Sequence, residues 1–161
     1  MALVTKRIGL SLGADICWPI AFTEIMKRNI ELVKRAGADT VIASCPACDL
    51  MWRQYYPEGA MKRGSDSPIK ARQCSGILAE QIKAGKFRFP KPEKPVTVTW
   101  HDSCHIGRAS GVYEPPRDVL RAIPGVELVE MERTKEAAWC CGGGGAVPQA
   151  YPDFGAFTAG K

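Results

Sequence analysis

The stretch TVIASCPAC, residues 40–48, decides the fold class, because a short apolar segment in it runs directly into a pair of thiols. Its β-branched and apolar residues predict a strand that ends at Ser44. Pro46 suits the first turn of a helix, which we expect to continue through Tyr55. The thiols of this motif are therefore predicted at the carboxyl end of a strand, where a helix begins.

The same order of strand and cysteine recurs in the second half of the chain. The segment VTVTW, residues 96–100, predicts a strand, and HDSCH follows it directly. A helix opened by the two prolines at 115–116 and a strand over 127–131 come next. Alternating strands and helices predict an α/β fold, which we expect to form two related Rossmann-like lobes with mainly parallel sheets. Ligands collect beyond the carboxyl ends of such strands, where the cysteines of both motifs are predicted.

Helices and a stiff connector complete the predicted organisation. A helix is expected from Thr23, which can cap it, to Gly37, and a second one around 77–84. The proline-rich segment FRFPKPEKP then predicts a connector between lobes. We therefore divide the chain into residues 1–88 and residues 89–161.

Composition and charge exclude several classes of protein. The chain has 161 residues, of which 45% are apolar, so it can bury a core. No apolar run approaches the roughly 18 to 20 residues that a membrane span requires, and the first residues do not resemble a secretion signal. We therefore expect a cytoplasmic protein. The net charge of +5 includes a modest cluster at Lys62, Arg63, Lys70 and Arg72. Since no aromatic residues interleave with this cluster, we expect no nucleic-acid partner.

The segment AWCCGGGGA, in which Cys140 and Cys141 are adjacent, poses the chemical question. Neighbouring Cα atoms lie about 3.8 Å apart, whereas disulfides need roughly 4.4 to 6.8 Å, so these thiols are not expected to pair. Two buried structural thiols are the alternative, but adjacent side chains of an extended segment point to opposite faces. The glycines allow a tight turn and expose N–H groups toward a negatively charged centre. This pattern favours a metal centre that carries sulfur.

An odd number of cysteines also favours metal ligation over a disulfide framework. The seven cysteines are Cys17, Cys45, Cys48, Cys74, Cys104, Cys140 and Cys141. Cys17 and Cys74 fit no ligand spacing and are assigned to packing. A lone C-x-x-C motif is compatible with a redox dithiol, a zinc or iron ligand pair, or coincidence. The cysteines that follow it favour iron-sulfur ligation, because an adjacent pair suits a multi-iron cluster better than one tetrahedral ion.

These motifs resemble a known family. HDSCHIGRASGVYEPPRDVLRAIPGVELVEM followed by CCGGGG resembles the cysteine-rich CCG domain of the heterodisulfide reductase catalytic subunit family, which also occurs in glycolate and lactate oxidase iron-sulfur subunits. That family repeats a pattern of Cys, Cys-Cys-Gly and C-x-x-C. Residues 1–88 resemble the C-terminal part of a first repeat, and residues 89–161 the N-terminal part of a second. No Cys-Cys-Gly precedes Cys45 and no C-x-x-C follows Cys141, so we expect a fragment.

The resemblance implies the cofactors. Cys104, Cys140 and Cys141, with Gly142 shaping the turn, would bind a noncubane [4Fe-4S] cluster. Cys45 and Cys48 would bind a second cluster or zinc. Because each cluster of the family draws on its own repeat, we expect two incomplete half-sites in this chain.

The resemblance also implies the function. It indicates an oxidoreductase subunit that passes electrons to a disulfide substrate or a linked respiratory partner, together with iron-sulfur or flavoprotein subunits, some of them membrane-bound. Location at the periphery of a membrane complex is thus an alternative to a purely cytoplasmic one. Two other functions stay open: a zinc- or cluster-stabilised docking and electron-relay module without substrate chemistry, and a C-x-x-C thiol-disulfide oxidoreductase.

No catalytic side chain is assigned, and the polar residues near the motifs have ordinary structural alternatives. His101 and His105 flank Cys104 and could donate a hydrogen bond or proton to a substrate sulfur, or simply contact the backbone of the loop. Asp102 is expected to stabilise a turn. Arg108 and Arg117 could bind an anionic group, but a salt bridge is the commoner role of such residues.

Overall fold

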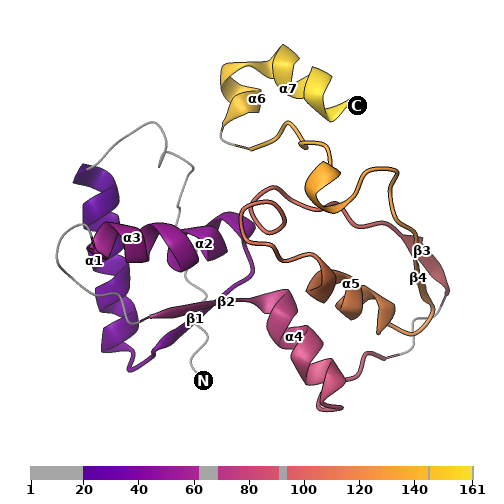
Figure 1. Cartoon of the computed structure of the whole chain (residues 1–161), viewed down its shortest axis with the longest axis horizontal. Helices are drawn as coiled ribbons and strands as arrows, with labels where there is room; N and C mark the ends of the chain where they lie inside the picture. Colours follow the sequence, from indigo (N-terminus) through magenta and orange to yellow (C-terminus); the bar gives the residue numbers. More distant parts are fainter. Residues whose placement is uncertain (1–19, 62–68, 91–93, 145, 161) are drawn as a thin grey trace. The chain divides into compact units, whose positions relative to one another are not determined.

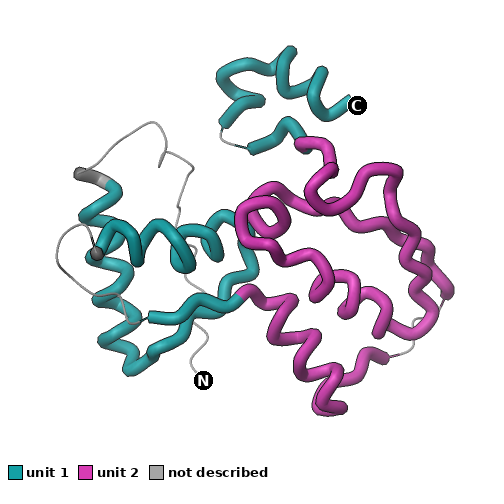
Figure 2. The backbone as a smooth tube through the Cα atoms, viewed as in Figure 1, with its two compact units in different colours: residues 1–72, 141–161 teal, residues 73–140 magenta. Residues whose placement is uncertain are grey.

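A computed structural model describes residues 20–61, 69–90, 94–144 and 146–160 (Figure 1). The chain divides into two compact units, unit 1 with residues 1–72 and 141–161, and unit 2 with residues 73–140 (Figure 2). In chain order the elements are α1 (Ile20–Arg35), β1 (Thr40–Ala43), α2 (Pro46–Leu50), the π-helix η2 (Met51–Tyr55), α3 (Tyr56–Met61), β2 (Lys70–Gln73), α4 (Cys74–Lys83), β3 (Val96–Val98), α5 (Glu114–Arg121), β4 (Val126–Leu128), the 3-10 helix η3 (Lys135–Ala137), α6 (Val147–Ala150) and α7 (Pro152–Ala159).

The hydrophobic core of unit 1 lies between α1 and the helices that follow the C-x-x-C motif. Tyr56 at its centre is fully buried, and the rings of Trp52 and Phe22 lie 4.8 and 5.8 Å from the Tyr56 ring. Asn29 Nδ2 donates a hydrogen bond to the Tyr56 hydroxyl at 2.7 Å. Residues at helical spacing after Pro46 therefore form core, and they pack the helices that follow the C-x-x-C motif against α1.

The helix α1 begins earlier than its sequence pattern predicts. It starts at Ile20, so Thr23 lies inside the helix and the prediction that it caps the helix is wrong. Phe22 is buried against Tyr56, and this tertiary contact extends the apolar face toward the N-terminus. The end of the helix before Gly37 is confirmed.

The strand predicted after Asp39 is confirmed as β1, and the helix predicted from Pro46 is confirmed as α2. The helix continues beyond Tyr55 through η2 and α3. No sequence pattern predicts β2, which joins β1 in a two-stranded sheet. The Lys70 N–H donates to the Asp39 carbonyl oxygen at 2.8 Å beside this pair.

In unit 2 the helix α4 packs against α5, and α5 packs against a second two-stranded sheet. In this sheet β3 runs parallel to β4, with Val96 opposite Val126 and Val98 opposite Leu128. Lys83 Nζ on α4 contacts Asp118 Oδ2 on α5 at 2.7 Å. Both strands are shorter than predicted, but their parallel direction is confirmed.

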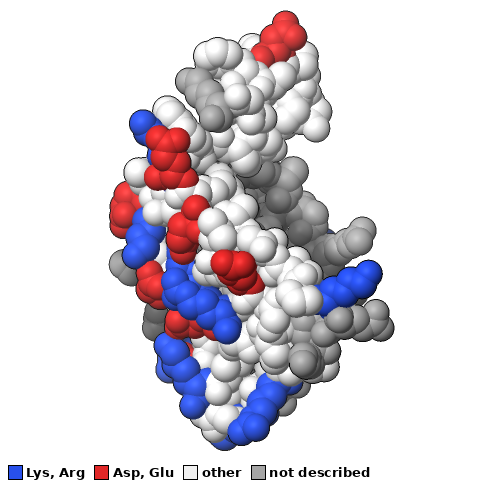
Figure 3. Space-filling model, turned by 90° about the vertical axis from the view of Figure 1, so that its right-hand side faces the viewer, with Lys and Arg blue, Asp and Glu red and all other residues white. Residues whose placement is uncertain are grey.

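The two short sheets and their helices make a mixed helix-and-strand fold that is compatible with the α/β class. The finer expectation of two related Rossmann-like lobes stays a prediction. On the face drawn in Figure 3, basic and acidic side chains are interspersed. Among the described residues, no helix combines the length and apolar composition that a membrane crossing needs.

Candidate functional site

The thiols of Cys45 and Cys48 form a close pair at the junction of β1 and α2. Cys45 is the N-cap residue of α2, with extended backbone angles, and Cys48 lies one turn into the helix. Burial, a hydrogen bond with Cys45 and the charge of Cys45 raise the pKa of Cys48 to about 11. The Cys48 thiol therefore keeps its proton in the metal-free chain, and a metal ion that binds here would have to displace it.

A buried carboxylate fixes the helical turn that carries Cys48. Asp49 is completely buried, and its two carboxylate oxygens accept hydrogen bonds from Arg53 Nε at 3.2 Å and Arg53 Nη2 at 3.1 Å. The Asp49 N–H donates to the Cys45 carbonyl oxygen at 3.0 Å. Sequence reasoning missed this pair, although Asp and Arg four residues apart in a predicted helix are a recognisable signal.

Cys104 is exposed at the start of the turn that covers residues 104–110 in unit 2. It lies beyond the carboxyl end of β3, separated from the strand by residues 99–103. The Ile106 N–H donates to Ser103 Oγ at 3.4 Å, so serine caps this turn. A Cβ atom at Gly107 would lie 2.8 Å from the Tyr113 ring, which packs against the same turn.

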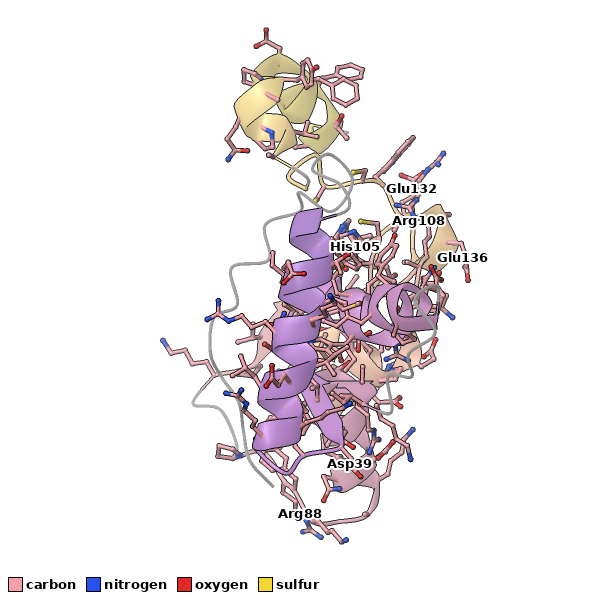
Figure 4. All side chains as sticks on the ribbon, turned by 90° about the vertical axis from the view of Figure 1, so that its left-hand side faces the viewer. Asp39, Arg88, His105, Arg108, Glu132 and Glu136 are labelled. Atoms are coloured by element: carbon pink, nitrogen blue, oxygen red, sulfur yellow. The ribbon has the colours of Figure 1, made fainter. Side chains whose placement is uncertain are left out.

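Charged and titratable side chains lie in the same part of unit 2 as this turn (Figure 4). Figure 4 shows His105 and Arg108 at the same end of unit 2 as Glu132 and Glu136. Burial and the Glu136 carboxylate raise the pKa of Tyr113. His101 is exposed and His105 is half-buried, and their roles stay predictions.

Arg117, which the sequence left between anion binding and a salt bridge, forms a buried salt bridge. Its Nη2 lies 2.7 Å from Asp102 Oδ2, and both side chains are 1% exposed. Hydrogen bonds from Arg117 lower the pKa of Asp102, and hydrogen bonds to Asp102 and Glu130 raise that of Arg117. Asp102 therefore binds residues that are distant in the sequence, and it does more than stabilise a turn.

Cys140 ends unit 2, and Cys141 begins the C-terminal part of unit 1. Before them, Arg133 lies over the Trp139 ring, with its guanidinium carbon 4.2 Å from the ring centroid. After them, the Gly143 N–H donates to Cys141 Sγ at 3.5 Å. One amide of the glycine run therefore points at a motif sulfur, as amides do around the sulfur ligands of metal centres.

Replacing Gly142 by alanine is expected to disrupt the packing of α7. Gly142 has a φ of +70°, and a Cβ atom there would lie 2.5 Å from the Gly155 carbonyl oxygen. A side chain would thus combine backbone strain with a collision against main chain, at a cost of about 1–3 kcal/mol. Hydrogen exchange of the amides of residues 152–160 should speed up accordingly.

The matched control for this prediction is Gly144→Ala, because nothing lies within 4 Å of a Cβ atom at Gly144. This variant should keep the exchange rates of the parent chain. Equal exchange of α7 in the two variants would contradict the close approach of Gly142 to α7.

The structure brings some of the predicted ligands together but does not complete a site. Cys45 and Cys48 are paired, whereas within the described ranges no group of three or more His, Cys, Asp or Glu side chains is arranged to hold a metal ion. None of the six described cysteines forms a disulfide bond. Cys74, at the first position of α4, accepts a hydrogen bond from Gln73 Nε2 at 3.6 Å, and Cys17 lies outside the described residues.

Comparison with known proteins adds a family match. The family model of CCG, the cysteine-rich domain, matches residues 15–53 and 98–161. These ranges contain all five cysteines of the C-x-x-C, Cys104 and Cys-Cys-Gly motifs, and Cys74 lies outside them. No solved structure matches the chain.

Curated relatives carry names from redox chemistry. A subunit of the dihydromethanophenazine:CoB–CoM heterodisulfide reductase of Methanosarcina acetivorans is 40% identical over 131 residues, which cover 81% of this chain and 31% of that protein. A probable iron-sulfur-binding oxidoreductase of Bacillus subtilis is 37% identical over 128 residues, 78% of this chain and 17% of the relative. An EtfAB:quinone oxidoreductase of Syntrophomonas wolfei is 34% identical over 126 residues, 77% and 16% of the two chains. The chain therefore spans less than a third of the length of these relatives.

Proposed function

The chain belongs to the CCG cysteine-rich domain family, and from this membership we propose that it is part of an iron-sulfur redox subunit of heterodisulfide-reductase type. The observation that carries the proposal is that both matched ranges contain the cysteine motifs of the chain. Relatives named as a heterodisulfide reductase subunit and as an iron-sulfur-binding oxidoreductase support the redox role.

The donor atoms of the chain fit an iron-sulfur cluster. Thiolates are the usual ligands of iron-sulfur clusters, and the motif cysteines are exposed or half-buried and form no disulfide. The hydrogen bond from the Gly143 amide to Cys141 Sγ suits a sulfur that carries negative charge. A noncubane [4Fe-4S] cluster would be held by Cys104, Cys140 and Cys141, with Gly142 forming the turn beside them.

The pair of Cys45 and Cys48 would hold a second metal group, either a further cluster or zinc. The close approach of the two thiols supplies two ligands from one helical turn. The ion pair between buried Asp49 and partly exposed Arg53 fixes that turn, so the thiols are placed before metal binds. We also propose, from the same family membership, that residues 1–88 form the C-terminal part of a first repeat and residues 89–161 the N-terminal part of a second.

When bound, an iron-sulfur cluster takes up and releases single electrons. The residues of this chain would supply thiolates, orient them and donate hydrogen bonds to sulfur. No side chain is assigned as a nucleophile or proton donor. The electron acceptor would be a disulfide or a linked respiratory partner.

The proposed partners are other redox subunits, either iron-sulfur proteins or flavoproteins. The names of the relatives include a subunit of a reductase and a quinone oxidoreductase, and these names support assembly into a larger complex. A cytoplasmic location, with peripheral attachment to a membrane complex as the alternative, is proposed on the same basis.

A second function is favoured by one observation. The close pair of Cys45 and Cys48 supplies two ligands for zinc or a cluster, as in a zinc- or cluster-stabilised docking and electron-relay module without substrate chemistry. With a cluster bound, such a module would carry electrons to a catalytic flavoprotein, whereas with zinc, which has no redox chemistry, it would only dock that partner.

Anaerobic purification and reconstitution, with iron, acid-labile sulfide and zinc analysis and electron paramagnetic resonance (EPR), test these proposals. We expect iron with sulfide, bound weakly and at fewer than four irons per chain, because we propose two incomplete half-sites. Zinc without iron would exclude the iron-sulfur function and leave the docking module. A metal-free chain with a readily reducible Cys45–Cys48 disulfide would favour thiol-disulfide exchange. One full four-iron cluster per chain, lost equally in Cys48→Ser and Cys140→Ser, would show that the five thiols converge.

A further inference from the structure

The guanidinium of Arg117 uses all of its hydrogen-bond donors inside unit 2. Nε and Nη2 donate to the two Glu130 oxygens at 2.7 and 2.9 Å. Nη1 and Nη2 donate to the two Asp102 oxygens at 2.8 and 2.7 Å. The remaining Nη1 proton goes to the Tyr113 carbonyl oxygen at 2.8 Å. Since a guanidinium has five N–H groups, this planar group is saturated, with a two-pronged contact to each carboxylate.

These contacts join the two segments of unit 2 that lead to motif cysteines. Asp102 lies two positions before Cys104. Glu130 lies on the segment that leaves β4 and leads to Cys140. Arg117 sits between them on α5 and bonds to both at once.

A further hydrogen bond joins the same two segments directly, without Arg117. Asp102 Oδ2 also accepts the Lys135 N–H at 2.6 Å. Lys135 has a φ of +55°, a left-handed conformation that is unfavourable for a residue with a side chain. It opens η3, after which Ala138 is buried at 2% exposure directly before Trp139 and Cys140. The segment before Cys140 is therefore anchored at Glu130, Lys135 and Ala138.

Because Arg117 and Asp102 are buried, their ion pair is stable in only one relative position of the two cysteine segments. Arg117 and Asp102 are 1% exposed, whereas Glu130 keeps 37% of its side chain accessible. A buried charge pair loses hydration, so it persists only where every donor and acceptor is matched. A shift of either cysteine segment would leave a buried charge or N–H group without its partner.

We infer that Arg117 is a positioning residue, which acts through Asp102 and Glu130 to hold the segment that ends at Cys104 against the segment that ends at Cys140. The inference rests on the proposed function only in naming the two cysteines as cluster ligands. It assigns Arg117 no contact with a substrate or a cluster.

The test uses the full 161-residue chain with Arg117→Lys, because lysine keeps the charge but cannot form the two forked contacts. The matched control is Arg121→Lys on the same helix, whose side chain is 52% exposed and whose ion pairs are 3.6 Å or longer. Deuterium uptake of the reduced, metal-free chain is measured for peptides covering residues 99–106, 131–140 and 74–83. The same proteins are then reconstituted, and their EPR spectra and rates of iron release to a chelator are compared.

Arg117→Lys should raise the exchange rates of 99–106 and 131–140 by about tenfold and leave those of α4, residues 74–83, unchanged, whereas Arg121→Lys matches the parent. After reconstitution, Arg117→Lys should release iron about 10 to 100 times faster, as for residues that orient metal ligands, with an altered EPR line shape. Unchanged exchange of the two cysteine segments, or an equal rise in α4, would overturn the inference.

The deuterium-uptake measurement on the metal-free chain tests the role of Arg117 even if the parent chain binds no iron. Failure to bind iron would contradict the proposed function but not the positioning role of Arg117. Arg117→Ala serves as a second variant, in which complete loss of fold would still leave the lysine variant to decide.

Discussion

Replacing Cys141 by serine is expected to remove most of the iron and sulfide that the half-site of Cys104, Cys140 and Cys141 binds in the reconstituted chain. Cys141 belongs to the Cys-Cys-Gly motif inside a matched family segment, and its sulfur accepts the Gly143 amide at 3.5 Å. A serine hydroxyl replaces a thiolate ligand poorly, because it is a harder donor that stays protonated at neutral pH. The affinity of this half-site for iron should fall by at least about tenfold, which is the lower end of the loss in metal affinity seen when residues that support metal ligands are replaced.

Cys74→Ser is the matched control for this experiment. Cys74 is half-buried at the start of α4, outside the matched segments, and contacts Gln73. Iron and sulfide per chain are measured after identical anaerobic reconstitution, with circular dichroism to confirm that both variants fold. Cys74→Ser should retain the parent content. Equal iron in the two variants would show that Cys141 is not a ligand.

Replacing Arg117 by methionine is expected to lower the free energy of unfolding of unit 2 by about 3–5 kcal/mol, the usual cost of removing one partner of a buried ion pair. Methionine fills much of the volume but leaves the Asp102 carboxylate 1% exposed and without its forked partner. The Lys135 N–H and the Trp100 side chain then remain as hydrogen-bond donors to Asp102. Urea unfolding followed by circular dichroism measures the change.

Two further variants separate the buried charge from lost packing. Arg117→Met combined with Asp102→Asn removes the charge and keeps an oxygen for the Lys135 N–H, so it should recover a large share of the lost stability. Arg121→Met, on the exposed side of α5, should change the free energy of unfolding by no more than about 0.5 kcal/mol. A double variant as unstable as Arg117→Met alone would assign the loss to packing.

Local patterns in the sequence predicted most of the elements around the cysteines. Pro46 and the prolines at 115–116 mark the beginnings of α2 and α5, because proline is favoured in a first helical turn. The apolar run before Ser44 predicted β1, and Val96 begins β3 as expected. These signals depend on residues that are close in sequence, so they can be recognised without knowledge of the fold.

Elements that depend on distant partners were missed. The strand β2 has the sequence KARQ, without apolar alternation, and it forms because β1 supplies its hydrogen-bond partners. Helix α1 starts at Ile20 because Phe22 packs against Tyr56, which lies in another helix. The π-helical turn of η2 likewise has no signal in its residues MWRQY.

The sequence by itself determined the family and the set of metal-binding candidates. Ligand motifs such as Cys45-Pro46-Ala47-Cys48 are defined by residue types at short spacing, so they can be recognised without a structure. Only the tertiary structure decided which charges are buried and what they bind. Arg117 meets Glu130 and Asp102 at separations of 13 and 15 residues, and Asp102 meets Lys135 at 33. Nothing local in the sequence distinguishes Arg117 from exposed Arg121 on the same helix, because burial depends on which surface of α5 the rest of unit 2 covers.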